Sequence, residues 1–140
     1  MQIVDADDAS IQQIAQVEKT SFVTEFYSQL QLIEMLSNPN YVIKVVKENN
    51  IFCGYIIIYK NIDFDEIYKI CVLEQFKRKG FGSALIEYSK NICQNKLFLE
   101  VRASNETAIQ FYLSNGFKIN GKRKGYYSGD EDAILMEYIK

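Results

Sequence analysis

Apolar positions recur along the chain with two different periods, and the change of period separates predicted helices from predicted strands. A short apolar run at residues 2–4 has the character of a strand. Two amphipathic helices are predicted next, over about residues 11–22 and 28–36. Asp7 or Asp8 can cap the first of them. The side chains expected to form the buried stripe of the second helix are Leu30, Ile33 and Leu36.

The middle of the chain has the composition of strands. Residues 41–46, 51–59 and 67–73 are rich in β-branched side chains, with turns predicted at residues 48–50 and 61–63. The remaining predicted elements are a helix at 82–93, a strand at 97–101, a helix at 105–114 and two strands flanking residues 128–130. This order predicts one α/β (α+β) domain over residues 1–140, with a mixed sheet and helices on both faces.

Composition narrows the chemistry that the chain can perform. The chain has no histidine, and its three cysteines (Cys53, Cys71 and Cys93) never form a C-x-x-C pair. Histidine-dependent nucleophiles and the common zinc motifs are therefore excluded, and we expect no metal. The formal charge of −2 gives no general attraction for nucleic acid. With neither a signal-peptide pattern nor an apolar run of about 20 residues, we expect a cytoplasmic protein without membrane contact.

A basic, glycine-containing segment, KRKGFG at residues 77–82, joins the strand at 67–73 to the next helix. Gly80 and Gly82 permit a sharp turn, and the unpaired N–H groups of the helix suit a phosphate. The spacing matches neither a Walker loop nor the dinucleotide fingerprint, because Leu85 stands where the latter needs glycine. Taken alone, the segment fits equally a phosphate site and a tight turn with a solvated basic rim.

The strand at residues 97–101 contains a glutamate. Alternation places Phe98 and Glu100 on the face opposite to the leucines and valine of this strand. An ionised carboxylate is costly to bury in a central strand. Glu100 is therefore either a functional acid or base, or the ion-pair partner of Arg102 on the same face.

The helix that follows carries two polar side chains two turns apart. Asn105 and Tyr112 lie on one side of this helix, which Ser104 can cap. Tyr112 either takes part in proton transfer with Glu100 or simply borders the apolar stripe of the helix. A carboxylate on a strand, a phenol on a helix and an adjacent phosphate loop together fit one reaction, the transfer of an acyl group to an amine.

These residues resemble the GNAT superfamily of acetyl-CoA-dependent N-acetyltransferases. Residues 80–82 are similar to the end of its Q/R-x-x-G-x-G/A loop, although Arg78 stands where a glycine is frequent. LEVRASNETAIQFYLSNGF at residues 99–117 and RKGYYSGDEDAILM at residues 123–136 are similar to the ribosomal-protein-alanine N-acetyltransferase branch. The resemblance, which covers residues 67–138 well, implies a mostly antiparallel seven-stranded sheet flanked by about four helices.

The resemblance also implies a mechanism and a set of site residues. Glu100 matches the base that deprotonates the amine, and Tyr112 matches the acid that protonates the leaving CoA sulfur. The residues expected to contact acetyl-CoA are Ile70, Cys71, Val72, Lys77, Arg78, Lys79, Gly80, Phe81, Gly82, Ser83, Asn105 and Tyr112. Tyr27, Tyr126 and Tyr127 are expected beside the acceptor, although hairpin packing accounts equally well for the last two.

The expected acceptor is the N-terminal α-amine of a peptide or protein, with a ribosomal protein as the preferred target. Two alternatives stay open from the sequence. One is a GNAT activity on lysine side chains or a small amine, and the other is a domain that binds CoA or a partner protein without turnover.

Overall fold

The computed structural model describes residues 1–22, 25–127 and 130–140. Its elements are β1 (Gln2–Asp5), α1 (Asp8–Ser21), α2 (Gln29–Ser37), β2 (Tyr41–Glu48), β3 (Ile51–Lys60), β4 (Asp65–Val72), a 3-10 turn (Glu74–Phe76), α3 (Phe81–Ile92), β5 (Lys96–Arg102), α4 (Glu106–Ser114), β6 (Lys118–Tyr127) and β7 (Glu131–Ile139). The strands form one sheet in the order β1-β2-β3-β4-β5-β7-β6. Neighbouring strands are antiparallel except for β4 and β5, so the predicted mixed, mostly antiparallel seven-stranded sheet is confirmed.

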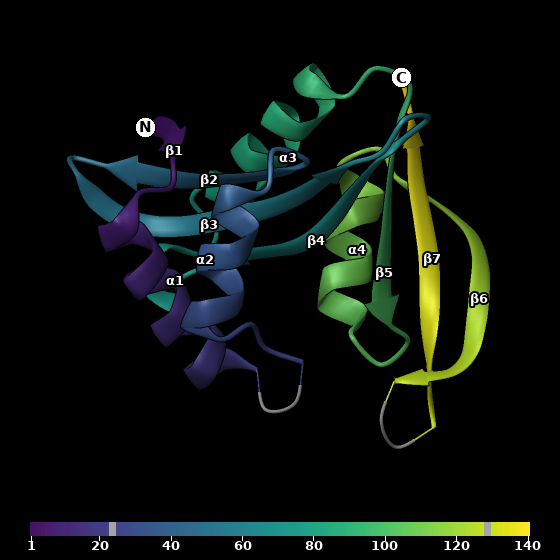
Figure 1. Ribbon diagram of the computed structural model, residues 1–140. Helices are drawn as coiled ribbons and strands as arrows, with labels where there is room; N and C mark the ends of the chain where they lie inside the picture. Colours follow the sequence, from purple (N-terminus) through teal and green to yellow (C-terminus); the bar gives the residue numbers. More distant parts are fainter. Residues whose placement is uncertain (23–24, 128–129) are drawn as a thin grey trace.

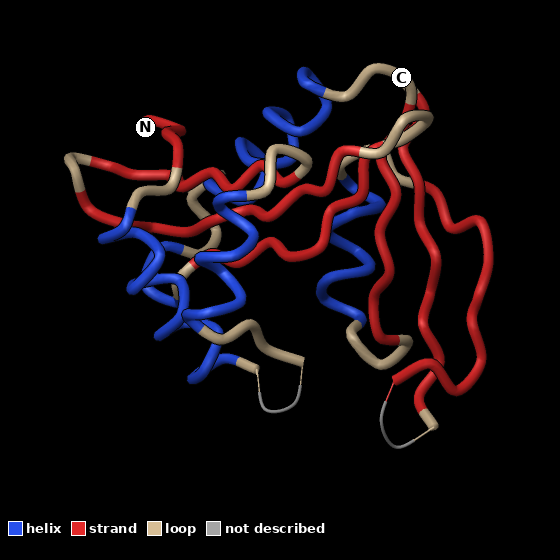
Figure 2. The backbone as a smooth tube through the Cα atoms, in the orientation of Figure 1, coloured by secondary structure: helices blue, strands red, loops and turns tan. Residues whose placement is uncertain are grey.

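Helices cover both faces of this sheet, as predicted, and each face has its own core (Figures 1 and 2). α1 and α2 pack with alternate residues of β3, including Tyr55 and Ile57. α3 and α4 pack on the opposite face with Ile56 and Ile58. Because successive side chains of a strand point to opposite faces, β3 supplies both cores and is buried along most of its length.

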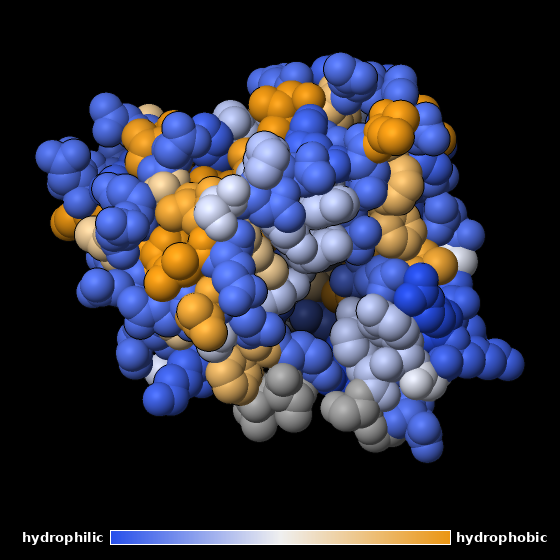
Figure 3. Space-filling view, in the orientation of Figure 1, coloured by the Kyte–Doolittle hydropathy of each residue, from blue (hydrophilic) through white to orange (hydrophobic). Residues whose placement is uncertain are grey.

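The predicted buried stripe of α2 is wrong. Leu30, Ile33 and Leu36 are 67%, 48% and 39% exposed, whereas Leu32 is fully buried. The helix carries two apolar arcs, and packing against α1 and the sheet selects the arc of Leu32 and Met35. Helical periodicity alone does not choose between the arcs. Figure 3 shows apolar side chains gathered on the α1–α2 side of the molecule.

The turns follow the sequence closely. Asn49 and Asn50 have φ values of 52° and 65°, and they join β2 to β3 as predicted. Asparagine tolerates this left-handed region better than most residues do. The turn predicted at residues 128–130 includes Ser128 and Gly129, which lie outside the described residues. Within the described part of the chain, no helix is long and apolar enough to cross a membrane.

Candidate active site

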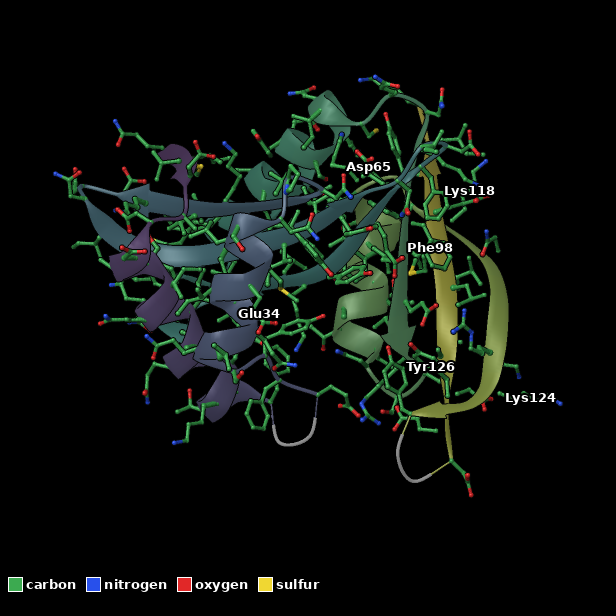
Figure 4. The ribbon with its side chains drawn as sticks, in the orientation of Figure 1. Glu34, Asp65, Phe98, Lys118, Lys124 and Tyr126 are labelled. Atoms are coloured by element: carbon green, nitrogen blue, oxygen red, sulfur yellow. The ribbon has the colours of Figure 1, made fainter. Side chains whose placement is uncertain are left out.

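The two parallel strands at the centre of the sheet separate soon after they pair. Asp65 is paired with Leu97 and Glu66 with Phe98, and both strands continue beyond these pairs. In Figure 1 the remaining parts of β4 and β5 diverge, and Figure 4 places Asp65 at the end where the strands meet. Backbone groups that would otherwise pair with a neighbouring strand therefore face an opening, where a ligand can bind them.

A β-bulge lies at the start of this opening. Ile57 of β3 is paired with Lys69 and Ile58 with Ile67, so Tyr68 is an extra residue in β4. The side chains of Tyr68 and Lys69 consequently both face α1 and α2: Tyr68 packs against that core, and Lys69 pairs with a glutamate of α1.

After the bulge, the side chains of β4 alternate regularly. Ile70 and Val72 pack toward α3, whereas Cys71 packs on the opposite face with the α1–α2 core. Two of the three predicted cofactor residues in this strand thus face α3 with their side chains. The side chain of Cys71 does not, and burial raises the pKa of its thiol.

A pocket of about 840 Å³ lies between β4 and the first turns of α3 and α4. We call it the α3–α4 pocket. It is lined by Ile70, Val72, Glu74, Phe76, Lys77, Arg78, Gly80, Phe81, Gly82, Ser83, Asn105, Thr107, Ala108, Phe111 and Tyr112. This lining includes every predicted cofactor residue except Cys71 and Lys79. Basic side chains and helix N–H groups meet apolar side chains here, which suits a ligand with phosphates at one end and an apolar arm at the other.

The glycines of the loop have separate roles. Gly80 is the N-cap of α3 and adopts φ +87°, a conformation that other residues rarely take. Gly82 needs space, because an added Cβ would lie 3.1 Å from Cζ of Phe111. The first residues of α3, Phe81, Gly82 and Ser83, line the α3–α4 pocket, and their N–H groups have no partner within the helix.

Arg78 has φ +64° although it is not a glycine. We expect Arg78→Gly to stabilise the ligand-free protein by about 1 kcal/mol, because glycine adopts this backbone conformation without steric cost. Thermal unfolding should show a melting temperature raised by a few degrees, roughly what 1 kcal/mol gives in a domain of this size. Lys79→Gly is the matched control, since it removes a neighbouring charge at a residue without positive φ. An equal rise in that control would contradict backbone strain as the cause.

Asn105 caps α4, with its side-chain oxygen accepting a hydrogen bond from the N–H of Ala108 at 3.2 Å. The prediction that Ser104 is the cap is therefore wrong. The hydroxyl of Ser104 instead donates a hydrogen bond to Glu131 of β7, because the chain turns back toward that strand before the helix begins. Asn105 still lines the α3–α4 pocket.

Tyr112 lies on the pocket side of α4 and is 9% exposed. Its ring packs edge-on against those of Phe111 and Phe117. Burial raises the pKa of its hydroxyl, and nearby Tyr127 and Cys71 raise it further. The hydroxyl therefore keeps its proton throughout the neutral pH range and can act as a proton donor.

The side chain of Glu100 lies on the face of the sheet opposite to α3 and α4, as the strand alternation predicts. Its carboxylate forms an ion pair with Arg123 of β6 at 3.0 Å. The alternative pairing with Arg102 is wrong, because Arg102 pairs instead with Glu25 and Glu131. Arg123 reaches Glu100 across β7.

A second pocket, of about 640 Å³, contains Glu100. We call it the hairpin pocket, because the end of β6 forms one wall and the segment before α2 forms another. Its lining is Glu25, Phe26, Tyr27, Gln31, Glu66, Ile67, Tyr68, Lys69, Glu100, Tyr126 and Tyr127. All three tyrosines predicted beside the acceptor are among these residues. Figure 3 shows the molecule hollowed between α2 and the β6–β7 hairpin.

Sequence reasoning missed two further glutamates of the hairpin pocket, Glu25 and Glu66, of which Glu66 lies on β4. The pKa of Glu66 is shifted. Burial raises the pKa of its carboxyl, and the negative charge of Glu100 raises it further. Glu66 directly precedes the apolar strand predicted at residues 67–73, so the sequence pattern predicts a surface residue at the end of a strand. The pairing of Glu66 with Phe98 in β5 could have revealed it, but no local pattern predicts that register.

The two pockets approach each other at Tyr112 and Tyr127. Tyr112 lines the α3–α4 pocket, while Tyr127 lines the hairpin pocket and is close enough to raise the pKa of Tyr112. Burial, followed by the charge of Glu100, raises the pKa of Tyr127 to about 12. A phenol on one side of the sheet and a carboxylate on the other therefore lie near the opening between β4 and β5.

Residues 9–117 match the profile of the acetyltransferase (GNAT) family. An N-alpha-acetyltransferase of Saccharolobus solfataricus is 32% identical, and the match covers 92% of this chain and 89% of that protein. The [ribosomal protein bS18]-alanine N-acetyltransferase of Escherichia coli (strain K12) is 35% identical over 96 residues, which cover 64% of this chain and 65% of that protein.

Solved structures show the same likeness. The crystal structure of the ribosomal-protein-S18-alanine N-acetyltransferase from Escherichia coli has a TM-score of 0.85 and 26% identity, covering 99% of this chain and 92% of that chain. A Bacillus anthracis acetyltransferase structure in complex with acetyl coenzyme A has a TM-score of 0.69 and 29% identity, covering 77% of this chain and 67% of that chain. Acetyl coenzyme A is thus bound by a protein of this fold.

Proposed function

Because the chain belongs to the acetyltransferase (GNAT) family, as an acetyl-CoA-dependent N-acetyltransferase, we propose that it acetylates the N-terminal α-amine of a protein. The N-terminal alanine of a ribosomal protein is the proposed target, and the cytoplasm is the proposed site of the reaction. The observation that carries this choice is the match, in sequence and in fold, to Escherichia coli proteins named for that acceptor.

The α3–α4 pocket is the proposed site for acetyl-CoA. The first N–H groups of α3, with Lys77 and Arg78, would hold the phosphates, while Ile70 and Val72 would lie along the thioester arm. Acetyl-CoA supplies an acetyl group already activated as a thioester. The mixed basic and apolar lining supports this assignment.

Glu100 is the proposed base and removes a proton from the acceptor ammonium, directly or through a water molecule. The amine nitrogen then bonds to the acetyl carbon, and backbone N–H groups near Ile70 and Val72 stabilise the negative charge that develops on the carbonyl oxygen. As the carbon–sulfur bond breaks, Tyr112 donates its proton to the sulfur. The nitrogen then loses its second proton, which restores the Tyr112 hydroxyl through water, and the proton held by Glu100 passes to solvent. The products are an amide, the CoA thiol and one released proton.

The chemistry of the hairpin pocket supports an ammonium-bearing acceptor. Carboxylates of Glu66 and Glu100 and the rings of Tyr27, Tyr126 and Tyr127 line it, and both kinds of group attract cations. An α-amine has a reference pKa of about 8 and a lysine of about 10.4, so a carboxylate deprotonates an N-terminus more easily. This difference favours an N-terminus over a lysine side chain.

We expect steady-state acetyl transfer from acetyl-CoA to a short peptide that begins with alanine. A peptide with a blocked N-terminus and an internal lysine is the control, and spermidine tests a small amine. Blocking the N-terminus should abolish turnover, because the lysine ammonium holds its proton more tightly. Faster turnover of the lysine peptide or of spermidine would reject the proposed acceptor. Binding of acetyl-CoA without turnover of any amine would reject catalysis.

A further inference from the structure

The side chain of Lys69, in β4, contacts the residues that connect α1 to α2. Its ammonium donates a hydrogen bond to the backbone carbonyl of Glu25 at 2.6 Å and lies 3.3 Å from the ring centroid of Phe22. The ring of Tyr27 is centred 5.7 Å away. The lysine side chain is 14% exposed. The described residues at both ends of this connection therefore surround one cation, which the bulge at Tyr68 directs toward them.

Glu18 of α1 completes this arrangement beneath the connection. The residue is fully buried, and its Oε1 lies 3.3 Å from Nζ of Lys69. The same oxygen accepts a hydrogen bond from the backbone N–H of Tyr27 at 2.9 Å, and Oε2 accepts one from the hydroxyl of Tyr55. The ion pair thus fixes backbone atoms of two residues that line the hairpin pocket, Glu25 and Tyr27.

A buried ion pair of this kind is a poor source of folding stability. Its desolvation cost commonly equals or exceeds the attraction between the charges, and apolar side chains of similar size often stabilise a protein as well. Burial lowers the pKa of the Lys69 ammonium, and the opposing effect of Glu18 does not fully offset this. What apolar side chains could not supply is the fixed position of the Tyr27 N–H and the Glu25 carbonyl.

We propose that Glu18 and Lys69 are positioning residues for the acceptor, holding the Glu25–Tyr27 segment as a preformed wall of the hairpin pocket. The arrangement extends to the facing wall, because the side chain of Glu25 pairs with Arg102, and Arg102 lies 4.4 Å from the ring centroid of Tyr127. The inference rests on the proposed function, in which the hairpin pocket receives the amine. A preformed wall lowers the ordering cost of binding, so it affects acceptor affinity more than the chemical step.

The test is a triple variant, Glu18→Met, Tyr55→Phe and Lys69→Met, with Tyr55→Phe alone as its matched control. The triple variant leaves no buried charge unpaired, so it is expected to fold. Its KM for the acceptor should rise on the order of tenfold, while kcat and the KM for acetyl-CoA stay within about twofold. Hydrogen exchange at the amide of Tyr27 should accelerate on the order of tenfold. If the triple variant does not fold, the double variant Glu18→Gln and Lys69→Met serves, because it also leaves no buried charge unpaired and removes the hydrogen bond from Lys69 to the Glu25 carbonyl.

An acceptor KM within about twofold of the Tyr55→Phe control would overturn the proposal, as would an equal rise in the KM for acetyl-CoA. Unchanged exchange at Tyr27 would overturn it without reference to any substrate. The acceptor used is the amine that the wild-type enzyme turns over fastest among the alanine peptide, the lysine peptide and spermidine. Rejection of the alanine peptide would therefore refute the proposed acceptor without removing this measurement.

Discussion

Replacing Glu100 with glutamine is expected to lower kcat on the order of 10²–10⁴-fold, the range over which a positioned general base accelerates proton transfer. Glutamine keeps the size of the side chain and can still accept a hydrogen bond from Arg123, which now lies 3.0 Å from the carboxylate. It cannot accept a proton from an ammonium. Steady-state kinetics with an alanine peptide at saturating acetyl-CoA would measure the loss, and thermal unfolding would show that the fold is retained.

Glu66 supplies a matched control for this substitution. It lines the same pocket on the neighbouring strand, and it carries the same functional group. Glu66→Gln should leave kcat within about tenfold of the wild type, because Glu100 is the proposed base and Glu66 takes no part in the proton transfer. A large loss of kcat in Glu66→Gln together with a small one in Glu100→Gln would transfer the role of base to Glu66.

Tyr112→Phe is expected to lower kcat on the order of 10²-fold or more, since it removes the proton intended for the departing sulfur. Phenylalanine preserves the ring contacts with Phe111 and Phe117, so the loss should not come from unfolding. Burial raises the pKa of the tyrosine above its ordinary value of 10.0. Ionisation of Tyr112 should therefore not reduce wild-type activity at any pH below about 10.

Tyr138→Phe is the control for the loss of a hydroxyl. Tyr138 contacts the same Phe117 ring, at 6.0 Å between centroids, but it is outside the lining of both pockets. Its substitution should leave kcat unchanged. A wild-type rate in Tyr112→Phe, measured under conditions where chemistry limits turnover, would exclude Tyr112 as the acid.

The sequence predicted those parts of the fold that depend on local patterns. Strand alternation placed Glu100 on the face opposite to Leu97 and Leu99, and the structure confirms that arrangement. The glycines at 80 and 82 marked the start of α3. Each of these predictions depends on side chains within a few residues of one another, where sterics and periodicity act directly.

Features that depend on long-range register were not predicted. Arg123 reaches Glu100 because β6 and β5 lie on the two sides of β7, where Ala133 is paired with both Arg102 and Arg123. The partner of Glu100 therefore depends on two strand registers, and neither register is encoded in the residues around position 100.

The roles of Glu100 and Tyr112 remain predictions, although the structure places the two side chains in adjoining pockets.

Periodicity also could not predict which side of α2 is exposed to solvent, for a different reason. Five of its positions are apolar, so more than one arc of the helix could have been buried. Packing against the rest of the chain decides such cases, and packing is not a local property.

The short contact between β4 and β5 also makes the segment between these strands a suitable junction for chimeric proteins. Every other strand pairing joins β1–β4 among themselves, within residues 2–72, or β5–β7 among themselves, within residues 96–139. A chimera that exchanges the first segment with that of a relative would keep both parental halves of the sheet intact. The strand pairs formed anew at the junction would be those that join the relative's counterparts of Asp65 and Glu66 to Leu97 and Phe98.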